Sequence, residues 1–142
     1  MHDQAHDTAG NSPAQFSRAE LATAAEVSLS TLDHWERRGL LRASIRKAEL
    51  GETVPNQYST ADRAVAIAVG RARRMGLRGE ILQRLADHLY ADPRLEADFD
   101  GWAVLTLKGD VRVSSDLPTL TELVAATNGT AFITIRIPQA SP

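Results

Sequence analysis

The sequence contains no cysteine among its 142 residues, and this absence excludes three kinds of chemistry. Disulfide bonds, thiolate metal sites and cysteine nucleophiles all require the sulfur of that side chain. Long hydrophobic runs are also missing, so we expect no transmembrane helix. The polar start of the chain lacks the apolar core of a signal peptide, and we therefore expect a cytoplasmic protein.

Motifs typical of enzymes are missing as well. The sequence has no glycine-rich phosphate loop, no nucleophile elbow and no catalytic carboxylate pair in context. We therefore expect neither enzymatic activity nor a cofactor. The segment HDQAHDT would bring His2 and His6 to one side of a helix, but the polar composition of residues 1–15 predicts a disordered tail and no metal site.

What the sequence does contain is a helix-turn-helix pattern between Phe16 and Leu41. Ser17 and Glu20 form a capping box, which predicts a helix beginning at about Arg18. Ser28 is the next capping residue, and it predicts a second helix over residues 29–38 that ends at Gly39. This layout is the one that places a helix in the major groove of DNA.

The residues that follow predict a wing and two more helices. Residues 40–58 combine apolar, basic and turn-forming residues, which suggests a β-hairpin with its turn near residues 49–52. Ser59 and Asp62 form a second capping signal, so a third helix should run to Gly76. A fourth begins at Gly79 or Glu80 and ends at Asp92–Pro93. Residues 16–89 thus read as a winged helix-turn-helix domain.

Three segments in this order resemble the MerR family of winged helix-turn-helix transcription regulators. They are SLSTLDHWERRGLL (residues 28–41), QYST (residues 57–60) and RRMGLRGEI (residues 73–81). The resemblance implies a regulator that places its recognition helix and wing on duplex DNA. It is incomplete, because Asp33 and Asn56 stand where the family usually has arginines, while Tyr58 is retained.

The residue types on the recognition helix and wing define the expected DNA contacts. Hydroxyls at a helix start and basic side chains suit phosphate oxygens and base edges. Asp33 accepts from a cytosine amino group or pairs locally with Arg37, and we favour the local pair. Trp35 is expected in the core. The candidate DNA-binding residues are Ser28, Ser30, Thr31, His34, Arg37, Arg38, Arg42, Arg46, Lys47, Asn56 and Tyr58.

Charge is segregated along the chain. Residues 16–89 carry 12 basic and 9 acidic side chains, whereas residues 90–142 carry 4 basic and 7 acidic ones. A positive head on a chain of net charge −2 suits a domain whose DNA affinity depends on salt. Arg71, Arg73 and Arg74 are equivocal, since they either contribute to this surface or simply line the outer face of the third helix.

The second half of the chain predicts a linker over residues 90–101 and a β-β-α-β module over residues 102–142. Strands over residues 102–107 and 111–115 flank a turn at residues 108–110. A helix starting near Pro118 and ending at Asn128–Gly129 precedes a last strand that ends at Pro138. Together with the helical head, this pattern predicts an α+β fold.

The small module suggests two uses. Pro93 and Gly101 interrupt any long dimerisation helix, so the exposed edge formed by Phe132, Ile133, Ile135 and Ile137 is the candidate interface for a homodimer or a protein partner. Alternatively, the module simply packs on the helical head. Two further functions remain open beside a DNA-binding regulator: an antitoxin or adaptor acting through this module, and an architectural DNA binder such as a phage excisionase.

Overall fold

A computed structural model describes residues 15–43, 58–128 and 130–140, and its fold is α+β as the sequence predicts. In these residues, five α-helices and one 3-10 helix accompany a three-stranded antiparallel sheet. The elements are α2 (Arg18–Ala25), α3 (Leu29–Arg38), α5 (Thr60–Arg74), α6 (Glu80–Ala91), η1 (Pro93–Glu96), β1 (Gly101–Thr106), β2 (Val111–Ser114), α7 (Leu120–Thr127) and β3 (Phe132–Ile137). The expected tail and most of the expected wing, including Arg46, Lys47 and Asn56, lie outside the described residues.

The helix-turn-helix forms where its capping residues predict it. The Ser17 hydroxyl accepts from the Glu20 amide at 3.1 Å, and the Glu20 carboxylate accepts from the Ser17 amide at 2.8 Å. Ser28 caps α3 in the same way through the Thr31 amide. Gly39 ends α3 with φ 80, in the left-handed region that glycine adopts without strain.

Helix α5 lies at the centre of the molecule and is buried along most of its length. Its small residues allow neighbours to approach closely. At Gly70 an added Cβ would lie 3.0 Å from the Ala25 carbonyl oxygen of α2, so this glycine permits the close contact between the two helices. The helical pair α2–α3 therefore packs directly on α5, while α6 packs along another side.

The segment after α6 is packed rather than extended. Asp92 accepts from the Arg94 amide at 3.0 Å and so caps η1, whose Leu95 is fully buried. The sequence predicts a linker over residues 90–101 because its composition is polar. The buried Leu95 anchors it together with the partly buried Phe99, and η1 contacts both α5 and α6.

The sheet has the order β2-β1-β3 and separates two layers. Ala103 of β1 pairs with Ile135 of β3, and both side chains face α5 and are fully buried. Val104 points to the opposite face, where it lines a hollow together with residues of α7. This alternation follows from the period of two in a strand. The predicted β-β-α-β order is therefore confirmed.

Helix α7 begins two residues later than the sequence predicts. A start near Pro118 is expected because proline favours a first helical turn. The structure instead begins at Leu120, because Thr119 and Glu122 form a reciprocal capping box. The predicted end at Asn128 is confirmed, with φ 55 in the left-handed region.

The module and the helical head share one continuous core that includes Leu85, Leu95, Leu105 and Ile135. Arg71 of α5 donates a hydrogen bond to the Arg136 carbonyl of β3 at 2.7 Å. Of the two arrangements that the sequence leaves open, the described residues adopt the one in which the module packs on the head. No helix in the described part of the chain has the length and apolar character needed to span a bilayer.

Candidate nucleic-acid interface

Helix α3 presents a polar face to solvent because its apolar residues point inward. Leu32 and Trp35 are buried against the core, and the expected core position of Trp35 is confirmed. The residues between them, Asp33 and His34, and the following Arg37 are exposed. The helix thus has the division into a packed stripe and an open face that a recognition helix needs.

The start of α3 gathers three hydroxyls. The Ser28 Oγ lies 3.1 Å from the Ser30 Oγ and 2.9 Å from the Thr31 Oγ1. Ser28 and Ser30 are exposed, so the group stands at the solvent end of the helix. Hydroxyls at a helix start are suitable donors and acceptors for phosphate oxygens and base edges.

Asp33 pairs with Arg18 of α2, so the prediction that it pairs with Arg37 is wrong. One guanidinium nitrogen of Arg18 binds Asp33, and the other donates to Glu36 at 2.9 Å and to the Tyr58 hydroxyl at 2.9 Å. Spacing along one helix favours Arg37, but α2 crosses close enough to α3 for a different helix to supply the cation. The negative charge of Asp33 and Glu36 on α3 is therefore partly balanced by a cation on α2.

Tyr58 is part of the core and not of the surface, which corrects its assignment as a DNA contact. Its side chain is fully buried, and its hydroxyl donates to Glu36 while accepting from Arg18. Burial and the neighbouring Glu36 carboxylate raise the pKa of this phenol far above its usual value. The backbone of Tyr58 also pairs with Phe16, which joins the start of the described chain to the entrance of α5.

Arg42 is fixed at α6, where the chain leaves the helix-turn-helix. Its guanidinium lies 4.4 Å from the Tyr90 ring centroid and donates to Asp87 at 3.1 Å. Its backbone amide donates to the Tyr90 hydroxyl at 2.9 Å, and that hydroxyl donates to Asp62 at 2.6 Å. Arg42 is half exposed. It is partly neutralised by Asp87, so it contributes less free positive charge than Arg37 and Arg38 do.

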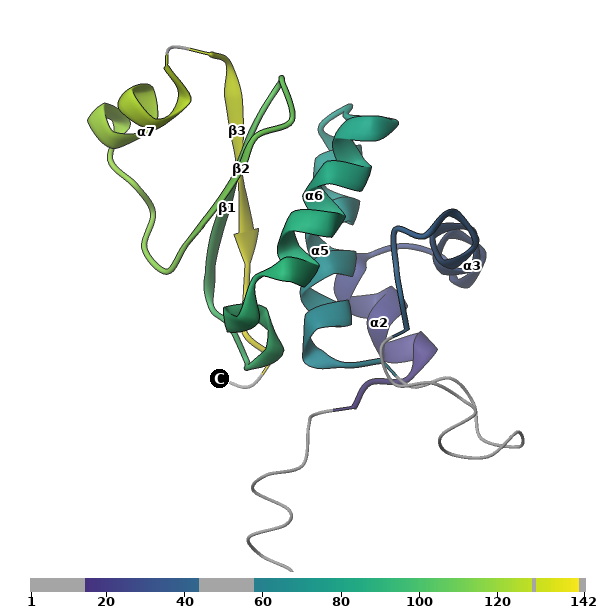
Figure 1. The fold of residues 1–142 in the computed structure, drawn as a ribbon. Coiled ribbons are helices and arrows are strands. Elements are labelled where there is room, and N and C mark those ends of the chain that lie inside the picture. The colour runs from purple at the N-terminus through teal and green to yellow at the C-terminus, as the bar shows by residue number, and fades with distance from the viewer. Residues whose placement is uncertain (1–14, 44–57, 129, 141–142) are drawn as a thin grey trace, which may run out of the picture.

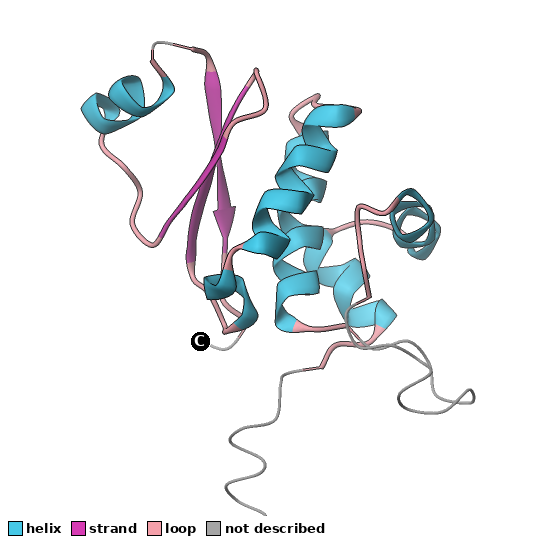
Figure 2. Cartoon of the chain, viewed as in Figure 1, coloured by secondary structure: helices cyan, strands magenta, loops and turns pink. Residues whose placement is uncertain are grey.

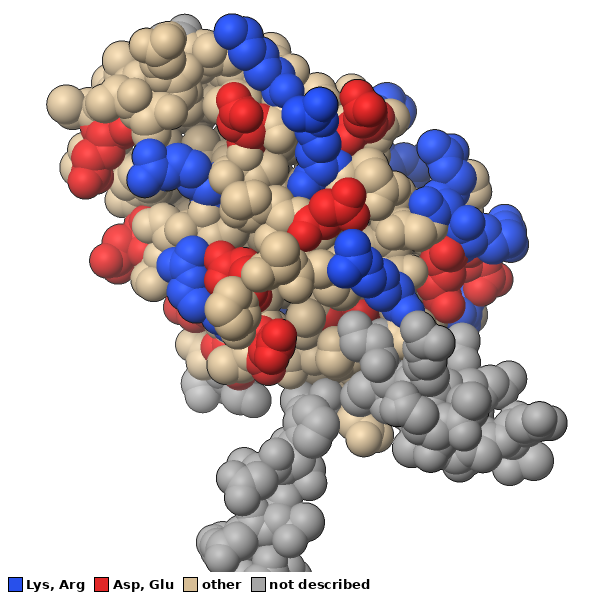
Figure 3. Space-filling view, in the orientation of Figure 1, with Lys and Arg blue, Asp and Glu red and all other residues tan. Residues whose placement is uncertain are grey.

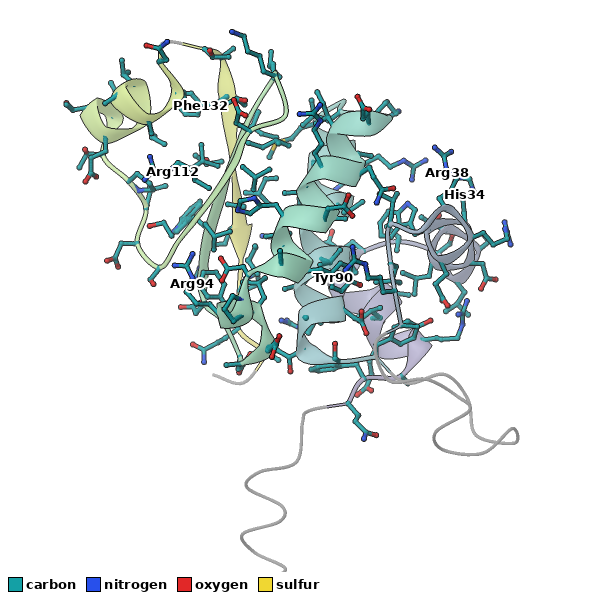
Figure 4. The ribbon with its side chains drawn as sticks, viewed as in Figure 1. His34, Arg38, Tyr90, Arg94, Arg112 and Phe132 are labelled. Atoms are coloured by element: carbon teal, nitrogen blue, oxygen red, sulfur yellow. The ribbon has the colours of Figure 1, made fainter. Side chains whose placement is uncertain are left out.

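A groove beside α3 collects basic side chains that are distant in the sequence. It lies between α3 and the turn joining α5 to α6, with a volume of about 460 Å³. His34 and Arg38 line it from α3, and Figure 4 shows both side chains extending from that helix. Arg73 lines it from the end of α5, and Arg78 lines it from the turn before α6. We call these four residues the basic groove.

Arg78 is held in place by the end of α5. Its guanidinium donates to the Arg73 carbonyl at 2.9 Å and to the Leu77 carbonyl at 3.0 Å. Arg73 and Arg78 also line a second hollow that reaches Thr31 at the start of α3. The two arginines therefore border α3 from its start to its end, and Lys and Arg side chains gather on this side of the molecule in Figure 3.

The start of α6 opens into the same groove. Its N-cap is Gly79, which supplies no side chain to cap the first turn. Gly79, Glu80 and Gln83 line the groove, so the first turn of α6, which no side chain caps, borders a region that also contains arginines. Helix starts favour anions, although the Glu80 carboxylate offsets part of this effect.

Sequence reasoning found one side of this surface and missed the other. Ser28, Ser30, Thr31, His34, Arg37 and Arg38 are brought together on α3 as expected. Arg73 was left equivocal, and Arg78 and Arg18 were assigned no role. The glycines at positions 76 and 79, which bend the chain between α5 and α6, were the available signal.

The structure changes the candidate interface on β3. Ile135 and Ile137 are fully buried against α5, so their side chains are not available to a partner, while Phe132 and Ile133 are half-buried. The amide of Leu107 donates to the Ala131 carbonyl, so the backbone groups of every second residue from Ala131 onward are directed to β1. The residues between them, including Arg136, direct their backbone groups to the outer edge of the sheet. Arg71 already occupies the Arg136 carbonyl.

Arginines occupy outward-facing carbonyls on both edges of the sheet. Arg63 donates to the Pro138 carbonyl at 2.8 Å, just beyond β3. On the opposite edge, Arg94 donates to the Val113 carbonyl of β2 at 3.1 Å. Edge carbonyls bound in this way are less open to pairing with another chain. Only the Phe132 end of β3 keeps the open edge that the sequence predicts.

Comparison with protein-family models and with curated proteins finds no match for this chain. The described residues contain no group of three His, Cys, Asp or Glu side chains able to hold a metal ion. The chemistry of the site therefore comes from hydroxyls, a histidine and arginines.

Proposed function

We propose that the protein is a regulator of the MerR-like type that binds double-stranded DNA through α3 and the basic groove. The observation that carries this proposal is the meeting of His34 and Arg38 of α3 with Arg73 at the end of α5 and Arg78 in the turn before α6. Four side chains from two separate segments create one cationic strip beside an exposed helix. Such a strip suits a phosphate backbone that runs along a groove edge.

The two parts of the surface have different tasks. Helix α3 enters the major groove with the Ser28–Thr31 end and His34 near base edges, because that groove admits a helix and distinguishes all base pairs. Arg38, Arg73 and Arg78 lie to one side of α3 and bind phosphates, which fix the orientation of the helix.

The pairing of Asp33 with Arg18 supports this orientation. A free carboxylate on α3 would be repelled by phosphates, and Arg18 reduces this repulsion although it is shared with Glu36. The Asp33 carboxylate remains 52% exposed on its outer side. It is therefore able to accept a hydrogen bond from a cytosine amino group.

The direct test is binding of the purified chain to a mixed pool of duplex DNA, measured by fluorescence anisotropy. Arg38→Ala and Arg73→Ala each lower affinity several-fold if they bind phosphates. Lys108→Ala is the matched control, because it removes one exposed cation from the turn between β1 and β2. Equal affinity in all four proteins would contradict the proposal.

Homodimerisation belongs to the same proposal, since paired half-sites match a two-fold protein. The open Phe132 end of β3 and the exposed apolar residues Leu117, Leu120 and Val124 support it. Sedimentation equilibrium with and without duplex DNA tests it. A protein that stays monomeric on DNA would contradict the proposed homodimer but not the proposed DNA-binding surface.

The same apolar residues favour a second function, in which the C-terminal module binds another protein as an antitoxin or adaptor does. This alternative predicts a protein complex that survives changes of salt and persists when Arg38 and Arg73 are replaced. A third function, that of an architectural binder, predicts that the protein bends DNA. The bend is measured from the gel mobility of complexes in which the binding site lies at different positions along the DNA fragment.

A further inference from the structure

A cavity lies between the outer face of the sheet and α7, on the side of the molecule away from the recognition helix. Its volume is about 350 Å³, which is within the range of small-molecule sites. It is distinct from the basic groove, and it shares only Leu117 with the exposed apolar residues that support the proposed homodimer.

The cavity exists because α7 packs sparsely against the sheet. Leu123 is buried and faces Val104, whereas the neighbouring Ala126 is too short to fill the space beside them. Both ends of α7 are fixed, by the Thr119–Glu122 capping box and by Asn128. The Ser114 hydroxyl also donates to the Asp116 carbonyl at 2.6 Å, which holds the connecting loop.

Apolar side chains form much of the wall. Val104 contributes from β1, and Leu117, Pro118, Leu123 and Ala126 contribute from the loop and from α7. An apolar wall of this size favours a small hydrocarbon body, such as a short alkyl chain or one ring.

Arg112 supplies the cation of the cavity. It lies opposite Val104 in the pairing of β2 with β1, so its side chain belongs to the face that α7 covers. Figure 4 shows Arg112 in the space between the sheet and α7. Its side chain is exposed, and no hydrogen bond or ion pair within the described residues engages its guanidinium, in contrast to Arg94 and Arg136 of the same module. Hydrogen bonds from Thr119 and, as a smaller cause, the charge of Arg112 lower the pKa of the nearby Glu122.

The two carboxylates at the cavity have different positions. Glu122 is committed to the cap of α7, where it accepts from the Thr119 amide at 2.8 Å and from the Thr119 hydroxyl at 3.1 Å. Asp116 is exposed on the connecting loop. Arg112 is therefore the charged group available to a ligand inside the cavity.

We propose that this cavity binds a small carboxylic acid with an apolar body, whose carboxylate pairs with Arg112 and whose hydrocarbon part contacts Val104 and Leu123. A guanidinium matches a carboxylate with two parallel hydrogen bonds, which an alcohol or an amine does not form. The ligand class is a monocarboxylate of about six to eight carbons.

Titration of the full-length, isotope-labelled chain with hexanoate tests the proposal by amide chemical shifts. We expect saturable shifts confined to β2, the loop after it and α7. Hexanol should bind about tenfold more weakly because it lacks the charge-assisted hydrogen bonds, and hexylammonium weaker still. Non-saturating shifts, shifts spread over the molecule, or preference for the amine would overturn the proposal.

Two variants separate the charge from the cavity. Arg112→Gln should weaken hexanoate binding about tenfold and leave hexanol unchanged, while Lys108→Gln changes neither. Ala126→Leu should weaken both ligands, because it fills the space and keeps every charge. Each variant is first checked for an unchanged amide spectrum outside the module. Unaltered hexanoate binding in Arg112→Gln would refute the role of this arginine.

Discussion

At the residue scale, the arrangement around Arg18 explains how an acid is accommodated on the helix that we propose to contact DNA. Arg18 binds Asp33, Glu36 and Tyr58 at once, so it joins α2, α3 and the entrance of α5. Asp33 and its cation come from different helices, and spacing within α3 pointed to Arg37 instead. The spacing of residues along one helix cannot show ion pairs that form only when two helices pack together. The partner of Asp33 was therefore predicted wrongly from the sequence.

Replacing Arg18 by Gln should expose the charge of Asp33 to DNA. We expect affinity for duplex DNA to fall roughly five- to tenfold, because an unbalanced carboxylate then faces phosphates. Adding Asp33→Asn to Arg18→Gln should restore most of the loss, which a double-mutant cycle measures. If the double variant binds as weakly as Arg18→Gln alone, the pair has no electrostatic role in binding. The melting temperature of each variant is the control for folding.

The two tyrosines make a second prediction at this scale, since Tyr58 and Tyr90 are the only ones in the chain. Burial, followed by a neighbouring carboxylate, raises the pKa of both phenols far above the usual value of about 10. A raised pKa in the folded state means that their stabilising contribution is complete below about pH 10 and is lost as the pH rises further.

Tyrosinate absorbance should therefore not develop near pH 10 while the protein is folded. We expect it to rise together with the loss of helical circular dichroism at higher pH, whereas the protein unfolded in denaturant should titrate at about 10. A full tyrosinate signal near pH 10 with circular dichroism intact would show that the phenols are accessible.

At the element scale, local signals predicted the helices well, and contacts between elements were less readable. Ser17, Ser28 and Ser59 each cap the helix that they announce, because capping depends on residues only three positions apart. The basic groove needs α3 to lie beside the turn after Arg74, which no local pattern specifies. Leu95 likewise converts an expected linker into a packed segment.

Gly70 tests how closely α2 must approach α5. Gly70→Leu should lower the free energy of unfolding by about 1–3 kcal/mol, because its side chain collides with the Ala25 carbonyl and pushes the helix-turn-helix away. Gly70→Ala is the control. The added methyl carbon would lie 3.0 Å from that oxygen, and alanine favours a helix by about 1 kcal/mol over glycine. These two effects oppose each other, so we expect little change in the free energy of unfolding of Gly70→Ala. Chemical denaturation measures both, and equal stability of Gly70→Leu and the parent would contradict the close contact.

At the scale of the whole molecule, the head and the module form one core instead of two independent units. β3 packs on α5 through Ile135 and Ile137, and α5 arginines bind the backbone at its outer edge. Sequence reasoning identified every strand of the module, yet treated its apolar edge as an interface. The buried partner of that edge is α5, more than fifty residues earlier in the chain.

One shared core predicts one unfolding transition. Trp35 reports on the helical head and Trp102 on the module, and the chain has no other tryptophan. In denaturant, Trp35→Phe and Trp102→Phe should show fluorescence transitions that coincide with the loss of circular dichroism within each variant. A module transition clearly separated from that of the head would show that the two parts unfold independently.

The central claim is that the basic groove and α3 together bind the DNA backbone. The salt dependence of duplex DNA affinity tests it most directly, because each phosphate contact that is lost flattens the log–log slope by about 0.9. We expect this flattening for Arg73→Ala and for Arg78→Ala, and an unchanged slope for Lys108→Ala. The same slope in all three variants and the parent, or affinity that does not depend on salt, would contradict the account.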